Sequence, residues 1–417
     1  MPLHLAGILG LIIIFVVGTT RSINLGALSL ALTFLVGTVL VGETPREMAS
    51  GFPVDLFVLL TGVTYLFGVA TKNGTVERIV DRAVGLARGR RSLVPWVVFA
   101  VAAFPAMAGA IGSAGVALLA PLAMRLAERC NLDRRMMGLM VVHGAASGNF
   151  SPLNVLAAII RQAMSDRGLE MSAGLLFGAN LFYNVALGFI IVAWFGGFRR
   201  TPDPRAPESS DGEALSSNGR FSPDQLWTVA AIAGVAIVSL GFGVNIGFSA
   251  LTAGVLLQAI FPAQTQGAER HIAWSVVLLV CGIVTYVSAL QRFGTIDAVG
   301  IGIAGLGTPL LVAFLLCTVA AVTSAVASSA GILGAIIPLA APFMIQGGIG
   351  ASGMAVALAL SATVVDATPF STVGALVVAN ASEDERQHVY RGLLIWGFIM
   401  VITAPVITWL LFVLPSA

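Results

Sequence analysis

Long apolar runs separated by short polar segments make up most of the chain. Ten of these runs are long enough for helices that cross a bilayer, whose hydrocarbon core requires about 20 mostly apolar residues. The runs lie at about 4–20, 25–42, 53–71, 136–160 and 172–198, and then at 223–243, 245–263, 273–291, 351–379 and 391–413. This pattern predicts an all-α polytopic membrane protein.

One long polar segment divides the apolar runs into two groups. Residues 199–220 read RRTPDPRAPESSDGEALSSNGR, a composition rich in Pro, Ser, Gly and charge that is typical of a flexible linker. We therefore predict a first membrane half at 1–198, a linker at 199–222 and a second membrane half at 223–417.

The two halves share short stretches of sequence, which indicates an internal repeat. The matching stretches are GVTYLFGVATKNGTV (62–76) with GIVTYVSALQRFGTI (282–296), GSAGVALLAP (112–121) with SAGILGAIIP (329–338), and NFSPLN (149–154) with DATPFS (366–371). Pro121 and Pro152 lie 31 residues apart, as do Pro338 and Pro369. Equal spacing in both halves indicates duplication, which is a common origin of secondary transporters.

The apolar stretch at 93–128 has basic residues on both of its flanks. Short loops rich in Lys and Arg stay on the cytoplasmic side, so a single crossing here would place one basic cluster on the wrong side. A re-entrant hairpin with its tip at Gly109–Gly115 removes this conflict. The matching stretch, 308–346, has few charged flanks, as we expect for a hairpin that enters from the outside.

We therefore predict two inverted-topology repeats, each with five spanning helices and one re-entrant helical hairpin. One spanning helix in each half is expected to be broken, at 136–160 and at 351–379, because each contains a polar, proline-bearing segment. This topology predicts a multi-pass protein of the cell (inner, plasma) membrane, with both termini outside and the linker in the cytoplasm.

Composition and charge exclude other classes of protein. Apolar residues make up 57% of the chain and charged residues 10%, whereas soluble proteins carry about 25% charged residues. The 22 basic and 20 acidic residues leave a net charge of only +2, which excludes a charge-rich disordered chain and argues against nucleic acid as a partner.

Four helix-breaking segments interrupt the apolar sequence at membrane depth. They are the expected hairpin tips, 108–115 and 323–331, and the expected breaks, 147–154 and 365–372. Irregular backbone is tolerated at this depth only where it lines a cavity or is buried in protein. Freed N–H groups at half-helix N-termini favour an anion, and unwound carbonyls favour a cation. The sequence thus predicts a substrate site where these segments meet.

Two ionisable residues lie within the predicted spans, where charge is costly and often functional. We expect Asp366, with Ser147 and Thr363, to couple transport to sodium or to a proton; a structural, hydrogen-bonded carboxylate is the alternative. His143 either titrates near the substrate or is a buried core histidine. No lysine or arginine is expected within the membrane, so hydroxyls, amides, helix N-termini and co-bound cations would hold an anion. No cofactor is expected.

The motifs of the first half resemble a known family. The runs are FPVDLFVLLTGVTYLFGVATKNGTVERIVDRAVGLARGR (52–90), LVPWVVF (93–99) and MGLMVVHGAASGNFSPLNV (137–155), with DATPFSTVGAL (366–376) in the second half. They are similar to the malonate and dicarboxylate carriers of the MatC type, within the wider ion-transporter superfamily that includes the divalent-anion:sodium symporters.

The resemblance implies particular site residues. In the symporters a Ser-Asn-Thr triplet at each hairpin tip binds a substrate carboxylate and lines a sodium site, together with the unwound helix that follows. By proline alignment the triplets here read Ile111, Gly112, Ser113 and Ser328, Ser329, Ala330. The implied substrate-binding residues are Ser113, Asn149, Ser151, Asn154, Ser328, Ser329, Thr368, Ser371 and Thr372.

The resemblance also implies a function. We expect a secondary active transporter of small di- or tricarboxylates, such as malonate, succinate or malate, that works by alternating access, is coupled to a cation and forms a homodimer. The alternative is a cation/proton antiporter or an inorganic-anion exporter on the same scaffold, with Asp366 as the exchanging group. An intramembrane enzyme is disfavoured, because the sequence lacks a His-Glu-x-x-His pattern and a Gly-x-Ser-x-Gly elbow near a base.

Overall fold

The computed structural model is helical throughout the part of the chain that it describes, as the sequence predicts. The described residues are 2–21, 23–86, 91–196, 221–242, 244–296, 298, 309–325, 329–346 and 348–416. Within them, five helical segments are long and apolar enough to cross a membrane: Val54–Lys72, Ala173–Trp194, Pro262–Arg292, Ala351–Ala379 and Glu383–Ser416. Shorter apolar helices fill the remaining predicted spans.

The described helices of the first half precede the linker region. They are α1 (Pro2–Thr20), α2 (Leu25–Val36), α3 (Pro45–Ala49), α4 (Val54–Lys72), α5 (Thr75–Leu86), α6 (Val94–Met107), α7 (Gly112–Arg129), α8 (Arg134–Gly148), α9 (Val155–Ser165) and α10 (Ala173–Trp194).

The described helices of the second half follow in the same kind of order. They are α11 (Pro223–Phe242), α12 (Ile246–Ile260), α13 (Pro262–Thr265), α14 (Trp274–Arg292), α16 (Pro309–Ser324), α17 (Ser329–Gln346), α18 (Ala351–Thr363), the 3₁₀ turn η4 (Val364–Ala367), α19 (Thr372–Ala379) and α20 (Glu383–Thr408). Apart from Phe221 and Ser222, the predicted linker at 199–222 lies outside the described residues.

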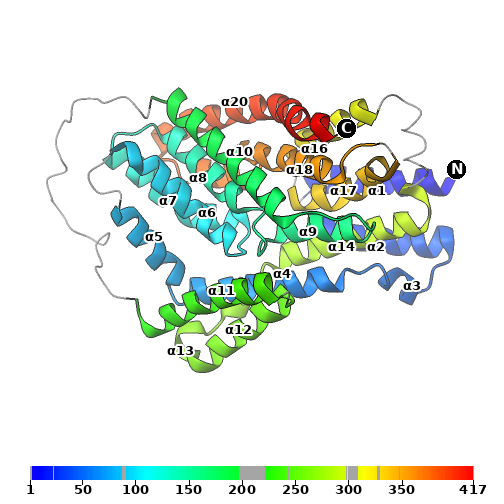
Figure 1. Ribbon diagram of the computed structural model, residues 1–417, viewed down its shortest axis with the longest axis horizontal. Coiled ribbons are helices and arrows are strands. Elements are labelled where there is room, and N and C mark those ends of the chain that lie inside the picture. Colours follow the sequence, from blue (N-terminus) through cyan, green and yellow to red (C-terminus); the bar gives the residue numbers. More distant parts are fainter. Residues whose placement is uncertain are drawn as a thin grey trace.

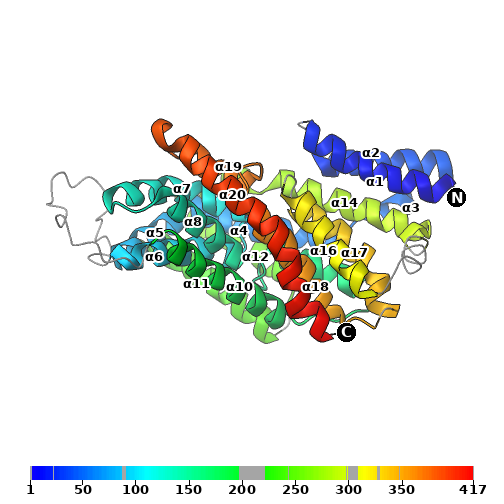
Figure 2. The same cartoon turned by 90° about the horizontal axis from the view of Figure 1, so that it is seen from above.

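The two halves contact each other through two equivalent pairs of helices. Helix α2 packs against α14, and α12 packs against α4. Glycines make both contacts close: a Cβ on Gly282 would lie 2.1 Å from the carbonyl oxygen of Gly26, and a Cβ on Gly62 would lie 2.1 Å from that of Gly247. Small residues of this kind let membrane helices touch through their backbones. Figures 1 and 2 show α14 beside α2, with α17 on its other side.

A second reciprocal contact joins the hairpins to the broken helices. Helix α7 packs against α19, and α17 packs against α9. Within each half, the first hairpin helix lies against the first part of the broken helix, as α6 on α8 and α16 on α18. This repeated contact scheme fits a duplicated chain. The inverted orientation of the halves in the bilayer stays a prediction.

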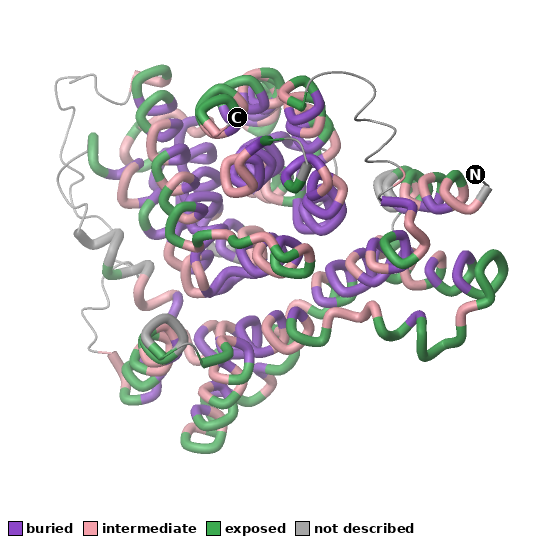
Figure 3. Tube along the Cα trace, turned by 45° about the vertical axis from the view of Figure 1, so that its right-hand side comes forward, coloured by how far each residue is buried: buried purple, intermediate pink, exposed green. Residues whose placement is uncertain are grey.

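Helices α8 and α18 form the centre of the molecule. Every residue from Met136 to Gly148 in α8 is buried, as is every residue from Met354 to Thr363 in α18. A helix that is apolar and buried on all sides belongs to a core rather than to a lipid-facing surface. Figure 3 shows buried residues concentrated in the larger bundle that contains the C-terminus, whereas the helices around the N-terminus carry more exposed positions.

Candidate functional site

The two central helices end at the two predicted breaks. Helix α8 stops at Gly148 and α9 begins at Val155, while α18 stops at Thr363 and α19 begins at Thr372 after the turn η4. The turn η4 packs against α8, so the second break lies against the core helix of the first half.

Side chains of the first break bind the tip of the first hairpin. The Ser151 hydroxyl donates to the carbonyl of Met107 at 2.7 Å. The Asn154 amide donates to the carbonyls of Ala106 at 2.9 Å and Ala110 at 3.1 Å, and its oxygen accepts from the Leu156 N–H as the N-cap of α9. These bonds bring side-chain donors to carbonyls at the turn between α6 and α7, where the helical hydrogen-bond pattern ends.

The second break repeats these roles with different residues. The Thr368 hydroxyl donates to the carbonyl of Ala325 at the second hairpin tip, at 2.6 Å. The Ser371 hydroxyl caps α19 by accepting from the Gly374 N–H at 3.0 Å, and it donates to the backbone carbonyls of Asp366 and Thr368. Thr368 thus corresponds to Ser151 and Ser371 to Asn154, as the aligned motifs suggest, and all four side chains hold backbone in place.

One side chain of each break faces the start of the second hairpin helix. Asn149 is 6% exposed, and its side-chain oxygen has no hydrogen-bond partner among the described residues. A Cβ on Gly112, the first residue of α7, would lie 3.2 Å from that oxygen. Asp366 faces Ser329, the first residue of α17, whose hydroxyl lies 2.7 Å from both carboxylate oxygens and accepts from the Ser324 hydroxyl. Asn149 and Asp366 therefore lie opposite equivalent positions of the two hairpins, but one is a neutral amide and the other a carboxylate.

The other predicted site residues have less direct positions. The Ser147 hydroxyl donates to the Gly144 carbonyl and the Thr363 hydroxyl to that of Ala359, so both protons are used within their own helices while both oxygens can still accept. Ser113 is half-buried as the second residue of α7, and Thr372 is exposed as the first residue of α19. Ser328 lies outside the described residues.

His143 lies in a buried hydrogen-bond chain that ends at the first break. The Trp396 indole N–H can only donate, and it donates to His143 Nε2 at 2.9 Å. The imidazole proton therefore sits on Nδ1, which donates to the Asn184 side-chain oxygen at 3.0 Å. This arrangement is that of a neutral core histidine.

The chain continues through two asparagines of α10 that the sequence reasoning missed. Asn184 donates to the Asn180 side-chain oxygen at 2.9 Å, and Asn180 donates to the carbonyls of Ala146 at 2.9 Å and Ser147 at 3.0 Å. These are among the last carbonyls of α8. Two asparagines four residues apart in the middle of an apolar run were the available signal, because polar side chains in membrane helices face other helices.

Arg161 is a basic residue close to the first break that the sequence reasoning did not single out. It follows the predicted span 136–160 by one residue, but its side chain turns back toward the break, and Nη2 donates to the Pro152 carbonyl at 3.2 Å. The Nε atom is buried and has no hydrogen-bond partner among the described residues. The sequence reasoning fixed the position along the helix and missed the direction of the side chain.

A cavity of about 590 Å³ is lined by residues of both halves. Its described lining includes the amino end of α4, α9, the carboxyl end of α14 and α17: Ser50–Leu56, Ile159, Gln162, Ala163, Asp166, Arg167, Val284, Val287, Ser288, Gln291, Arg292, Gly334 and Pro338. None of the predicted site residues is among them. The amino end of α4 and the carboxyl end of α14 thus meet at one cavity.

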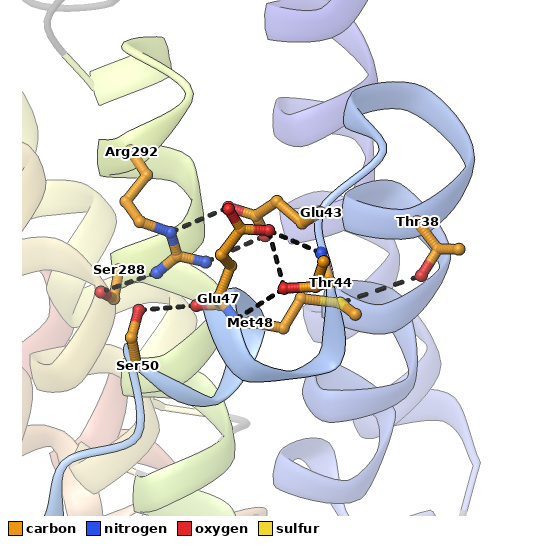
Figure 4. A network of polar contacts seen from close by, with 8 residues as sticks. All are labelled: Thr38, Glu43, Thr44, Glu47, Met48, Ser50, Ser288 and Arg292. Carbon is orange, nitrogen blue, oxygen red and sulfur yellow. Dashed lines mark hydrogen bonds and ion pairs between the residues drawn. The ribbon is translucent and has the colours of Figure 1, made fainter.

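An ion pair and a capped short helix order the rim of this cavity (Figure 4). Arg292 bonds both carboxylate oxygens of Glu43, with Nε at 2.9 Å and Nη2 at 3.1 Å, and its Nη1 donates to Ser288. Next to it, the backbone N–H and the hydroxyl of Thr44 both donate to Glu47, which keeps the pKa of that carboxyl below its usual value. The rim therefore joins α3 of the first half to α14 of the second.

Two family models match the chain. Residues 1–149 match the N-terminus of the dicarboxylate carrier protein MatC, and residues 243–416 match the citrate transporter family. The chain is a membrane transporter. Both families are transporters and neither is an enzyme family, so the resemblance to MatC-type carriers and the exclusion of an enzyme are confirmed.

A solved structure shares the fold of this transporter. The crystal structure of the Alcanivorax borkumensis YdaH transporter, described as having an unusual topology, aligns with a TM-score of 0.59 and 14% sequence identity over 92% of this chain and 96% of that one. At this identity the likeness concerns the fold alone. A comparison with curated proteins finds no matching relative.

Proposed function

We propose that the protein is a secondary active transporter of small di- or tricarboxylates, such as malonate, succinate or malate, coupled to a cation. The proposal rests on one combination of observations. Both ends of the chain match carboxylate-carrier families, and both breaks are held against hairpin tips by the same hydrogen bonds.

The backbone at these breaks suits an anionic substrate. Helices α7 and α9 begin next to the first break, and α17 and α19 begin next to the second. The N-terminus of a helix presents free N–H groups and a partial positive charge, which favour carboxylates. Each break thus has two helix N-termini beside it, and interrupted helices of this kind bind substrates near the membrane midplane in secondary transporters.

The coupling ion belongs, in this proposal, to the second break. Asp366 is the one carboxylate at either break among the described residues, and its visible partner is a hydroxyl, not a cation. A carboxylate within a membrane protein is costly unless it is paired or protonated. Sodium or a proton bound at Asp366 would remove this cost. The Ser329 hydroxyl, at the start of α17, and the Thr363 oxygen, at the end of α18, lie in the neighbouring segments. Because Ser329 belongs to the second hairpin, its contact with Asp366 would tie cation binding to closure of that hairpin.

Uptake into proteoliposomes tests the function. Labelled malonate, succinate and citrate are offered under an inward sodium gradient, an inward proton gradient or neither, with empty liposomes as the control. We expect uptake of at least one of these acids above the control under one gradient, with competition by the unlabelled acid. Failure of all three acids under both gradients would refute the substrate assignment.

A second candidate, cation/proton antiport, follows from the same carboxylate. If Asp366 exchanges a cation for a proton without an organic acid, an imposed cation gradient alone will move protons, and Asp366→Asn will abolish that movement. A pH-sensitive dye inside the proteoliposomes measures this. Proton movement that requires added dicarboxylate favours the first proposal over the second.

Topology and assembly are also part of the proposal. We propose a homodimer with both termini outside and the linker in the cytoplasm. A single cysteine introduced by Ser216→Cys, in a variant whose three native cysteines are replaced, should react with a membrane-impermeant maleimide only after the cells are opened. Mass measurement of the protein in detergent tests the dimer.

A further inference from the structure

Arg161 carries a partly buried positive charge that faces the first break. It lies in α9, six positions after the first residue of that helix, and its Nη2 donates to Pro152 inside the break. The buried Nε has no described hydrogen-bond partner. The ion pairs formed among the described residues involve Arg134, Arg135 and Arg292 rather than Arg161.

The direction of the side chain argues against a simple membrane anchor. An arginine that anchors a helix extends its charge toward the water at the helix end. The outer end of α9 is at Ser165, whereas the Arg161 guanidinium points the opposite way, to the break. Helical side chains lean toward the helix N-terminus, so the reach back over about 9 Å of helix is compatible with an extended arginine.

The Arg161 guanidinium has a hydrogen-bond donor, Nε, with no acceptor among the described residues, and an anion would supply one. Nε and Nη2 lie on the same edge of the guanidinium, the edge that holds a carboxylate with two parallel hydrogen bonds. Nη2 has two protons, so its bond to Pro152 leaves one available, and Nε has no described partner at all. Leaving a buried charge in this condition is costly unless a ligand completes it.

The second half has no counterpart of this charge. The residue six positions into α19 is Val378, where α9 has Arg161. The second break instead carries the carboxylate of Asp366, where the first break carries the neutral amide of Asn149. The duplicated scaffold thus places one positive group at one break and one negative group at the other.

We propose that Arg161 binds one carboxylate of the substrate at the first break and sets the preference for dianionic over monoanionic acids. The inference rests on the proposed transport of dicarboxylates and adds the residue that selects for the second negative charge. The remaining carboxylate is held by the helix N-termini at the breaks. An anionic lipid headgroup has the same chemistry and is treated as a competing source in the test.

The test compares acids that differ by one charge. Uptake of malonate and of its monoamide, malonamate, is measured in proteoliposomes containing the wild type, Arg161→Gln or Arg161→Lys. In Arg161→Gln we expect KM for malonate to rise at least tenfold and KM for malonamate to change less than threefold. Arg161→Lys, which keeps the charge and loses the two-bond geometry, should restore part of the difference.

Controls separate this inference from folding, from lipid effects and from the proposed function. Arg125→Gln removes an exposed arginine of α7 and should leave both KM values unchanged. Thermal unfolding and gel filtration check the fold, and Arg161→Lys provides the measurement if Arg161→Gln does not fold. The uptake assay is repeated in liposomes of neutral lipid and in liposomes with anionic lipid.

Each outcome decides a different claim. If the wild type takes up no dicarboxylate, both the proposed function and this inference fail. If the wild type transports malonate and the ratio of the two KM values is the same in wild type, Arg161→Gln and Arg161→Lys, the inference alone is overturned. A change in ratio that appears only in anionic lipid assigns Arg161 to the lipid headgroup and also overturns it.

Discussion

The two breaks of this transporter are alike in construction and unlike in charge. Ser151 and Thr368 both donate to a hairpin-tip carbonyl, and Asn154 and Ser371 both cap the helix that follows. The polar groups that remain for a ligand differ. The first break has Asn149, whose side-chain oxygen has no partner among the described residues, and nearby Arg161, and the second has Asp366 with Ser329.

In the proposed function, this difference would let two similarly built breaks bind two different ligands. The hydrogen bonds that hold irregular backbone within a membrane are needed in both halves, so both halves keep side chains that provide them. Asn149 and Asp366, which face the hairpin helices, are not needed to hold the backbone. One half can therefore have an amide at this place and the other a carboxylate. Four expected results test the comparison, from the largest effect to the smallest.

Exchanging the two facing groups gives the largest expected effect. Asp366→Asn removes the carboxylate from the second break, and we expect gradient-driven uptake to fall by about 100-fold, which corresponds to about 2.8 kcal/mol. Asn149→Asp adds a carboxylate beside Gly112 and should weaken substrate affinity by repelling the anion. Uptake driven by each gradient is compared with gradient-free exchange. Full gradient-driven uptake by Asp366→Asn would contradict the assignment.

Adding a methyl group at the crossing glycines should destabilise the protein. A Cβ on Gly62 or Gly282 overlaps a carbonyl oxygen of the opposing helix, and forcing such overlaps costs about 1–3 kcal/mol. We expect Gly62→Ala and Gly282→Ala to lower the unfolding temperature by similar amounts, because the contacts are reciprocal. Gly178→Ala is the control, since that α10 position has open space. An unchanged temperature for one of the pair would break the equivalence of the halves.

Removing the helix caps should have a smaller and unequal effect. Loss of an N-cap costs about 1 kcal/mol, and Asn154→Ala also removes two bonds to the hairpin tip that Ser371→Ala does not. We expect Asn154→Ala to lower the stability of the folded protein more than Ser371→Ala. Thermal unfolding in detergent measures both. Equal losses would mean that the amide bonds to Ala106 and Ala110 contribute little.

Opening the cavity rim should have the smallest effect. Partly exposed ion pairs stabilise proteins by about 1 kcal/mol or less, and the Arg292 and Glu43 side chains are 28% and 11% exposed. Arg292→Gln should therefore change stability little and lose most of its effect at high salt, where charges are screened. Unfolding curves at low and high salt check this, with Arg46→Gln as the control. A large salt-independent loss would show that the pair is a major contact between the halves.

Much of this architecture could be predicted from local sequence. The helix breaks at 149–154 and 368–371 follow from proline and polar residues that stand together within apolar runs, because proline removes a helical hydrogen bond and the polar side chains offer the backbone other partners. The alignment of Asn149 with Asp366 is reproduced by their shared position opposite the first residue of a hairpin helix. The proline alignment, which pairs Gly112 with Ser329, is reproduced as well, since these are the first residues of α7 and α17.

The predicted site residues separate into two groups only in three dimensions. Ser151, Asn154, Thr368 and Ser371 were expected to bind substrate, and their donors bind backbone instead. Sequence could not make this distinction, because a hydroxyl or amide at a break suits a ligand and a carbonyl equally well. Asn180 and Asn184, which join His143 in one hydrogen-bond chain, were missed for a related reason, since neither stood out by itself.

Local sequence was enough to predict the class of protein, the helical spans and the places where helices stop, because a bilayer penalises every unsatisfied backbone group and so restricts which residues can appear where. The tertiary structure alone decided which half packs on which, as in α2 with α14 and α9 with α17. It also decided that Arg161 turns toward the break. Both features depend on contacts between residues far apart in the chain, which no local pattern of apolar and polar positions specifies.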